Sequence, residues 1–249
     1  MPLFESESLV LRTHNLAEAD RIVVFLSRNY GIVRGVAKGT KRLKSQFGSS
    51  LEPFSRSNIS FFQNEERELV SIQQAELLRS SFSAASEPQI LGAWSYMAEL
   101  TIAFLPPHDP DERVYRMIAA CMDVSAAEPK SIGLITLYFE TWLLRLGGFF
   151  PDISACAQCE RVFTATERSV IAGVPHIYCI KCRRVGEENS LGGLDRELFQ
   201  QIRKLSPADL VEWAVQSGAA VSNNRKLTKR IIDSILKKEI DDHTFRLQI

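Results

Sequence analysis

Four cysteines in two closely spaced pairs constrain the fold of this chain more than any other feature of its sequence. Two residues separate Cys156 from Cys159 and Cys179 from Cys182, and nineteen residues lie between the pairs. A two-residue gap lets one tight turn aim two thiolates at the same point, so two such turns can surround one metal ion tetrahedrally. The spacing therefore predicts a zinc ribbon over residues 154–186, with a structural Zn2+ bound by all four cysteines. A closed shell of four sulfurs leaves no position for a water or a substrate.

The residues between the two pairs are typical of a short hairpin. Residues 161–163 and 175–178 are expected to form its strands, with Gly173 between them. Two disulfide bonds, or four unrelated cysteines, are the alternative interpretations. His176 lies close to the second pair but is surplus to the four ligands. The fifth cysteine, Cys121, lies in an apolar helical stretch and is interpreted as a small buried side chain.

Composition places the chain among ordinary globular proteins. The 249 residues are 45% apolar and 24% charged, with 30 basic and 30 acidic side chains. Because the formal net charge is zero, only the distribution of charge can indicate a partner. Residues 1–7 lack the basic start of a signal peptide, and no apolar run reaches the roughly 18 residues of a membrane span. We therefore expect a cytoplasmic protein with reduced cysteines and no membrane partner.

The first 80 residues are rich in β-strand signals. Short apolar or alternating segments, several of them bent by glycine, recur between turn signals. They cover residues 8–13, 20–27, 31–39, 56–62 and 69–77. Five such strands suit a closed barrel of the OB type over residues 1–80, although an SH3-like barrel fits the strand count nearly as well.

The character of the chain changes at Pro88, a residue that favours the first turn of a helix. Apolar residues then recur at helical spacing, interrupted by prolines and glycines. The expected helices cover residues 88–105, 111–124, 132–146, 194–205, 207–216 and 225–239. The predicted fold is α+β and multidomain: an N-terminal OB-type β-barrel, followed by a helical domain over residues 81–249 that carries the four-cysteine zinc ribbon.

Positive charge is concentrated in the predicted barrel. Residues 31–50 contain five basic side chains and no acidic one, and Arg12 lies on a neighbouring strand. The five are Arg34, Lys38, Lys41, Arg42 and Lys44. Residues 39–50 are expected to form an exposed, mobile loop, and basic groups on a small barrel can replace the counterions of a nucleic acid. A loop that is merely solvated is the alternative.

Aromatic side chains near the basic loop have two interpretations. Phe47 and either Phe61 or Phe62 can stack on unpaired bases, as OB barrels use aromatic residues to bind single strands. Packing in the core or in the loop is the more ordinary role for each of them.

The sequence contains no recognisable catalytic motif. A nucleophile elbow, a P-loop and a dinucleotide-binding glycine motif are all absent, and the four histidines are scattered. Asp109, Asp111 and Glu112 cluster at the start of an expected helix, where acidic side chains are favoured by the helix dipole. We therefore expect a binding protein rather than an enzyme.

The order of these features resembles that of the RecO family of DNA recombination and repair proteins. Several short motifs carry the resemblance, and their joint order is more specific than any one of them. They are Val10-Leu11-Arg12-Thr13, the segments at 18–23 and 31–39, Leu51-Glu52-Pro53-Phe54, the segment at 74–78, Phe139-Glu140 and the segment at 144–151 that leads into the cysteines.

The resemblance implies a non-enzymatic recombination mediator. Members of the family bind single- and double-stranded DNA, anneal complementary strands and, with RecR, help to load RecA on SSB-coated single-stranded DNA. The resemblance thus implies RecR, the SSB C-terminal tail and, indirectly, RecA as partners, and a cytoplasmic, nucleoid-associated protein. Carried over residue by residue, the DNA contacts are Arg12, Arg34, Lys38, Lys41, Arg42 and Lys44. A zinc-ribbon nucleic-acid-binding adaptor in transcription or RNA metabolism is the alternative.

Overall fold

The computed structural model describes residues 2–42, 45–63, 68–171, 176–183 and 190–246, with side chains described as far as residue 237. The chain divides into two compact units, Met1–Ile132 and Gly133–Ile249, and each is described by itself. The first unit therefore contains helices in addition to the barrel. The predicted domain boundary at residue 80 stays a prediction.

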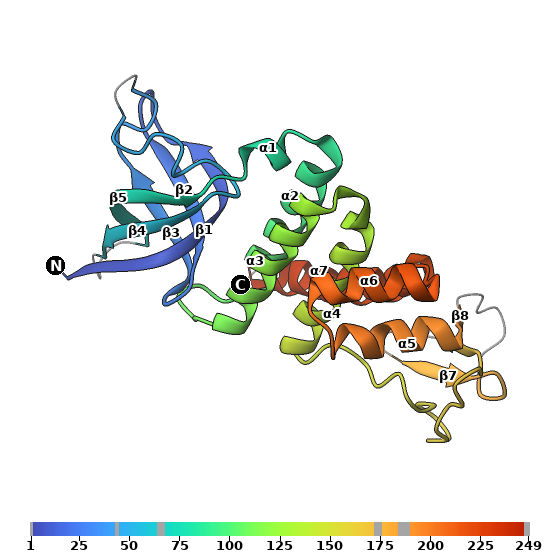
Figure 1. The fold of residues 1–249 in the computed structure, drawn as a ribbon. Coiled ribbons are helices and arrows are strands. Elements are labelled where there is room, and N and C mark those ends of the chain that lie inside the picture. Colours follow the sequence, from blue (N-terminus) through green and yellow to red (C-terminus); the bar gives the residue numbers. More distant parts are fainter. Residues whose placement is uncertain (1, 43–44, 64–67, 172–175, 184–189, 247–249) are drawn as a thin grey trace. The chain divides into compact units, whose positions relative to one another are not determined.

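Five strands of the first unit form a closed barrel (Figure 1). They are β1 (Leu3–Asn15), β2 (Arg21–Ser27), β3 (Gly31–Ala37), β4 (Arg56–Phe62) and β5 (Val70–Arg79). Their order is β1-β2-β3-β5-β4, and β4 pairs back onto β1. Only β3 and β5 pair in parallel; the other neighbours are antiparallel. This pairing is that of an OB barrel, which confirms the predicted OB-type fold over the SH3-like alternative.

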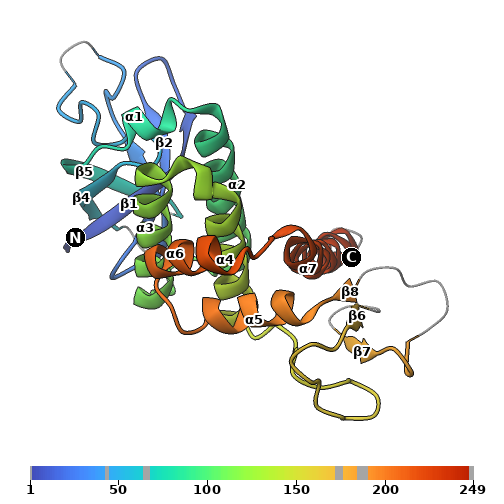
Figure 2. The same cartoon turned by 45° about the vertical axis from the view of Figure 1, so that its right-hand side comes forward.

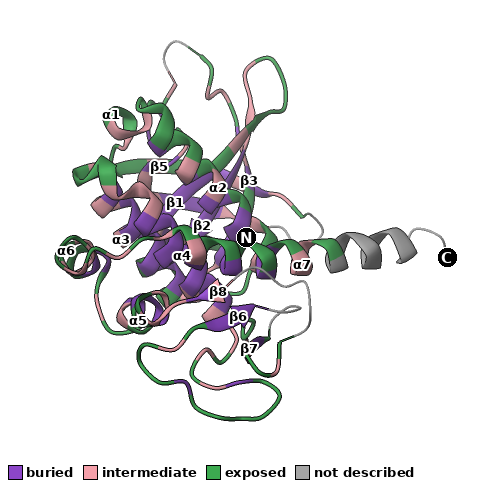
Figure 3. Ribbon diagram, turned by 90° about the vertical axis from the view of Figure 1, so that its right-hand side faces the viewer, coloured by how far each residue is buried: buried purple, intermediate pink, exposed green. Residues whose placement is uncertain are grey.

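Alternation along the strands fills the barrel with apolar side chains. Val23 and Phe25 of β2 and Phe61 of β4 point inward and are at most 1% exposed. Phe4 and Tyr30 pack on Phe61 at ring-centre distances of 5.7 and 5.5 Å. Aromatic rings bury large areas and add edge-to-face contacts, so the cluster stabilises the closed sheet. Figure 3 shows the strands largely in the colour of buried residues.

The outside of the barrel also carries apolar residues, and helices of the same unit cover part of them. The helices are α1 (Phe82–Ala85), α2 (Pro88–Phe104), α3 (Glu112–Ala127) and the 3-10 turn η1 (Pro129–Ser131). Trp94 of α2 is 2% exposed, packs against Phe54 at 5.6 Å and donates its indole N–H to Ser125 of α3 at 2.9 Å. Arg56 of β4 adds an ion pair with Asp123 of α3 at 2.8 Å. Barrel and helices are therefore joined by both apolar and polar contacts.

The second unit contains the remaining helices and a small sheet (Figure 2). The helices are α4 (Ile132–Leu146), whose first residue ends the first unit, α5 (Gly193–Ile202), α6 (Pro207–Ser217) and α7 (Ser222–Arg246). The strands β6 (Ser169–Ile171), β7 (Ile177–Cys179) and β8 (Ser190–Leu191) form a sheet in the order β7-β6-β8. Residues 161–163 are not a strand, so that prediction was wrong: Val162 makes only an isolated bridge to Ala155, and β6 pairs with β7 instead.

Helix α7 is fixed in the second unit by one side of its first four turns. Leu227, Ile231 and Ile232 are at most 2% exposed. On the same side Thr228 donates to the buried carboxylate of Glu140 in α4 at 2.6 Å, and Arg225 lies 3.4 Å from the same group. A buried carboxylate needs such partners to offset its desolvation, so this cluster specifies how α7 meets α4. Among the described residues, no helix is long and apolar enough to span a membrane.

Replacing Gly31 with alanine is expected to lower the free energy of unfolding by more than about 2 kcal/mol. Gly31 has φ +67°, and a Cβ there would lie 2.5 Å from the carbonyl oxygen of Asp109. Gly48 has φ +49° but no atom within 4 Å of such a Cβ, so Gly48→Ala is the matched control for backbone strain alone. Urea denaturation measures both variants. Equal losses would show that the close approach to Asp109 contributes nothing.

Candidate nucleic-acid interface and metal centre

The structure brings the four paired cysteines together. The Sγ atoms of Cys156, Cys159, Cys179 and Cys182 all lie within 4.8 Å of one another, and those of Cys159 and Cys179 are 4.0 Å apart. Four sulfurs about one ion at 2.3 Å would lie roughly 4 Å apart, so the observed spacing fits one tetrahedral metal ion. The alternative of four unrelated cysteines is therefore wrong, and the four cysteines could bind zinc.

Two tight turns aim the cysteines at this common point. In the first, Glu160 donates its backbone N–H to the carbonyl of Cys156 at 2.9 Å. In the second, Cys182 and Arg183 donate to the carbonyl of Cys179 at 3.0 and 3.1 Å. Glu160 has φ +57°, a left-handed conformation that is costly for a side chain larger than glycine. The strain at Glu160 is held by the surrounding turn, as expected where a site fixes the backbone.

Hydrogen bonds to sulfur favour the thiolate form that a metal requires. Burial alone raises the pKa of Cys156, but backbone N–H groups of Cys159, Cys179 and Gln158 donate to its sulfur, and the net result is a pKa of about 6. The amide of Cys179 lies 3.3 Å from the Cys156 sulfur. The pKa of Cys179 is also lowered, although burial opposes the shift. The turns thus favour the thiolate form of Cys156 and Cys179, whereas the hydrogen bond with Cys179 and burial raise the pKa of Cys182.

Arg161 lies beside the cysteine cluster, a neighbour that the spacing argument missed. Its side chain donates to the sulfur of Cys179 and forms a two-bonded ion pair with Glu167, with Nη1 2.8 Å from the carboxylate. This contact with Arg161 lowers the pKa of Glu167 to about 2. A cation beside a cluster of thiolates offsets part of their negative charge. The only sequence signal was the position of Arg161, two residues after Cys159.

Cys121 is not part of the metal centre. It is fully buried in α3, in the first unit, and burial raises the pKa of its thiol. Its interpretation as a small buried side chain is confirmed.

The basic candidates of the barrel gather on its outer face, at the end where the β1–β2 turn lies. Val24 of β2 pairs with Arg12 of β1 on one side and with Arg34 of β3 on the other. Residues directly opposite one another point to the same face, so Arg12 and Arg34 share the outer face with Val24 between them. Lys38 follows the inward-facing Ala37, which places it on the outer face with Arg34.

The loop after β3 brings two further cations to the β1–β2 turn. Lys41 donates its backbone N–H to the carbonyl of Ala19 at 3.1 Å and its Nζ to that of Ala17 at 3.3 Å. Arg42 curls back toward Gly39, whose N–H is bound by Asp20 at 2.8 Å. Lys41 and Arg42 are exposed, and Lys44 lies outside the described residues. We call this group of cations the basic face: Arg12, Arg34, Lys38, Lys41 and Arg42.

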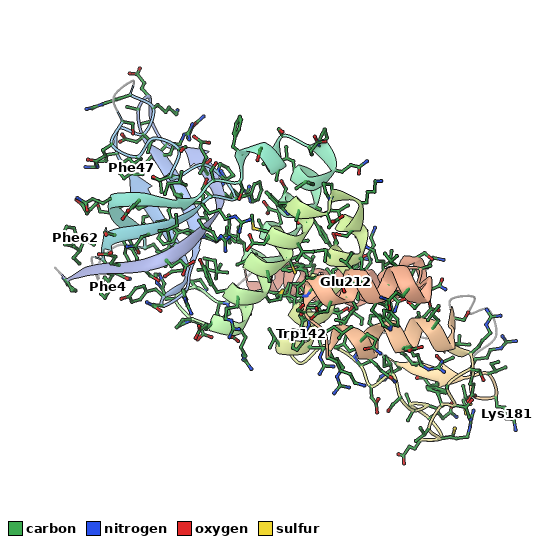
Figure 4. All side chains as sticks on the ribbon, viewed as in Figure 1. Phe4, Phe47, Phe62, Trp142, Lys181 and Glu212 are labelled. Atoms are coloured by element: carbon green, nitrogen blue, oxygen red, sulfur yellow. The ribbon has the colours of Figure 1, made fainter. Side chains whose placement is uncertain are left out.

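The loop is more strongly anchored than the sequence suggested. Phe47 is 3% exposed and Ser50 is 3% exposed, so the expectation of a fully exposed loop over residues 39–50 was wrong for these two. Figure 4 labels Phe47 together with Phe4 and Phe62 on the barrel. Since Phe47 and Phe61 belong to the barrel core, neither can stack on a base in this structure. Phe62 is partly exposed at the end of β4.

One member of the basic face is paired. Arg12 lies 3.0 Å from Glu99 of α2, with both side chains about half exposed at 46% and 56%. For the other four members, the described residues contain no carboxylate within ion-pair distance. Four unpaired cations on one face of a small barrel can therefore bind phosphates, and Arg12 can do so only in exchange for Glu99.

Comparison with known families identifies the chain. The family model described as recombination protein O N terminal matches residues 1–81, and the one described as recombination protein O C terminal matches residues 85–246. The chain belongs to the RecO family. The resemblance inferred from short motifs is thereby confirmed.

Individual relatives in the RecO family carry the name DNA repair protein RecO. The protein of Rubrobacter xylanophilus is 35% identical over 93% of this chain and 92% of its own length. That of Cutibacterium acnes is 29% identical over 91% of this chain and 90% of its own. That of Koribacter versatilis is 32% identical, but the match spans 63% of this chain and 64% of that protein. The chain is thus a RecO-family DNA repair protein, and its contact residues stay predictions.

Replacing Cys156 or Cys179 with serine is expected to abolish metal binding by the ribbon. The purified protein should contain about one metal ion per chain, because four thiolates complete one shell. Inductively coupled plasma mass spectrometry measures the content, and Cys121→Ala is the matched control, since Cys121 is remote from the cluster in sequence and fully buried. A metal-free wild-type protein would contradict the metal centre.

Proposed function

We propose that the chain is a DNA-binding recombination mediator without catalytic activity. It binds single- and double-stranded DNA, anneals complementary strands and, with RecR, helps to load RecA on single-stranded DNA coated by SSB. The observation that supports the proposal most directly is the basic face, with Arg34, Lys38, Lys41 and Arg42 exposed on an OB barrel. Membership of the RecO family supports the same role.

The basic face suits annealing because it acts on the sugar–phosphate backbone. Two DNA strands repel each other, and lysine and arginine side chains that replace their counterions lower this repulsion without reading sequence. The aromatic side chains Phe47 and Phe61 are occupied in the core. Binding therefore rests on phosphate contacts more than on base stacking, and we propose little sequence preference.

The metal is proposed to be Zn2+ with a structural role. Four cysteine sulfurs favour a soft or borderline cation, and zinc takes a tetrahedral sulfur shell without a geometric preference of its own. The ribbon has few large apolar side chains, and Phe163, Val170, Ile171 and Ile177 are its main buried ones. A bound metal can contribute on the order of 10 kcal/mol to the folding of such a small unit, so it substitutes for a core.

The partners belong to the same proposal. RecR and the acidic C-terminal tail of SSB are proposed as direct partners and RecA as an indirect one, in a cytoplasmic, nucleoid-associated protein with no membrane contact. The helical residues 81–249 are proposed to carry the SSB contact, and residues 1–80 the DNA contact.

Annealing of complementary strands coated with SSB, measured by fluorescence transfer between end labels, tests the function as a whole. If the protein does not accelerate annealing over the same SSB-coated strands without it, the proposed function is overturned.

Reversing Lys38, Lys41 and Arg42 together to glutamate is expected to weaken single-strand binding at least tenfold at moderate salt. Losing three phosphate contacts should also reduce the slope of log K against log salt by about 2. Fluorescence anisotropy over a salt series measures both quantities. Arg113, Arg116 and Lys130 are exposed on α3 and η1 of the same unit, and their reversal is the control with the same change in charge.

Two outcomes of the charge reversal would contradict the assignment of the basic face. If the variant and the control weaken binding equally, net charge rather than the basic face determines affinity. If neither changes it while circular dichroism shows a folded protein, DNA binds elsewhere and the assignment of the basic face is wrong.

A further inference from the structure

Arg196 of α5 is a buried cation whose contacts are all uncharged. Its side chain is 5% exposed. Nη2 donates to the carbonyl of Thr164 at 2.7 Å, and Nη1 donates to Ser169 Oγ at 3.3 Å and to the carbonyl of Leu191 at 3.4 Å. The guanidinium also lies over the ring of Phe163, 5.2 Å from its centre. Within the described part of the chain, no carboxylate reaches Arg196 at ion-pair distance.

The guanidinium of Arg196 has unused donors and no direct ion pair among the described residues. A guanidinium has five N–H groups, and the contacts above use three of them, which leaves two without an acceptor among the described residues. Burial lowers the pKa of Arg196, and the charges of Glu167 and Asp195, neither of which lies at ion-pair distance, act in the opposite direction. An arginine remains charged at any ordinary pH, so an anion bound directly to the guanidinium would offset part of its desolvation.

A cavity of about 510 Å³ lies beside this guanidinium. Arg196 and Gln200 of α5 line it one turn apart, the spacing that puts side chains on one side of a helix, and Lys204 lines it from just after the end of α5. Ser154 and Thr164 line it from the ribbon segment. Among the residues that line it, Glu197 supplies the single carboxylate, and Glu197 is exposed.

The backbone is shaped to bring these two segments close. A Cβ at Gly193 would lie 2.0 Å from the carbonyl oxygen of Ala165, so only glycine allows the ribbon segment to approach the start of α5. The approach is what places the carbonyl of Thr164 against Arg196. The backbone on this side of the cavity is therefore fixed by the close approach at Gly193.

We propose that this cavity binds a phosphate group carried by a molecule of about mononucleotide size. The free N–H groups of Arg196, the amides of Gln200 and Gln201, and the ammonium of Lys204 offer several donors, which suits the oxygens of a phosphate. The volume falls within the range of about 300–1,000 Å³ typical of small-ligand sites. Free phosphate, a nucleotide and the terminal phosphate of a strand share this chemistry. The inference goes beyond the proposed function, because it concerns a cavity in the second unit and not the basic face of the barrel.

The test is isothermal titration calorimetry of the full chain with inorganic phosphate and with deoxyadenosine monophosphate at low ionic strength. Arg196→Ala removes three hydrogen bonds and can unfold the region, so the informative variant is Gln200→Glu. It places a carboxylate one turn from Arg196, where it supplies a direct counter-ion from within the chain and competes with a bound phosphate. We expect binding of both probes to weaken at least tenfold and the melting temperature to stay equal or rise. Gln216→Glu, at an exposed position on α6 outside the cavity, is the matched control.

Each result of the titrations either supports the phosphate site or contradicts it. Tighter binding of the nucleotide than of phosphate supports a nucleotide or a strand end as the ligand, and equal binding supports free phosphate. No binding of either probe by the wild-type protein, or equal affinity in wild type and Gln200→Glu, overturns the site. Failure of the annealing experiment with intact phosphate binding would reject the proposed function and leave the cavity assignment standing.

Discussion

The pairing of β1 with two different strands is the constraint on which the first unit depends. β1 is 13 residues long. Its first half, from Leu3 to Leu9, pairs with β4, and its second half, from Ser8 to Asn15, pairs with β2. A register shift between Val10 and Arg12 bends the strand where it changes partner. Without this double pairing the sheet would stay open, with β1 and β4 exposed at its edges and Phe25 and Phe61 exposed to water.

Closure of the barrel also determines the electrostatics of its surface. Because Val23 and Phe25 must point inward, Val24 must point outward, and so must Arg12 and Arg34, which pair with it. Phe47 is drawn into the same core and anchors the loop that carries Lys41 and Arg42. The basic face is thus a consequence of the apolar core. Lys41 is also held by its hydrogen bonds to Ala17 and Ala19, which limits the ordering that binding would require.

Local patterns in the sequence were sufficient wherever the determining contacts are local. Helix α4 and strand β4 have the predicted bounds, because prolines, glycines or polar turns delimit an unbroken pattern at each of them. The cysteine spacing predicted the cluster for the same reason, since each turn spans only four residues. The sequence could not distinguish an OB-type barrel from an SH3-like one, because the difference depends on which strands pair and not on how many there are. The neutralisation of Arg12 by Glu99, 87 residues away, and the burial of Phe47 left no local signal.

The barrel and the ribbon are stabilised by different means, and this difference bears on how they can work. The barrel buries a continuous apolar cluster of its own side chains, and α2 and α3 pack on its outside. The ribbon, in contrast, has three-residue strands, a residue in a left-handed conformation at Glu160 and four cysteines placed where they could hold a metal ion. Arg161 and Glu167 neutralise each other, and Arg161 also reaches Cys179, so they position one ligand without adding net charge. Removal of the proposed metal ion should therefore loosen the ribbon and leave the barrel's basic face intact, which would separate a structural role of that ion from the proposed contacts with DNA.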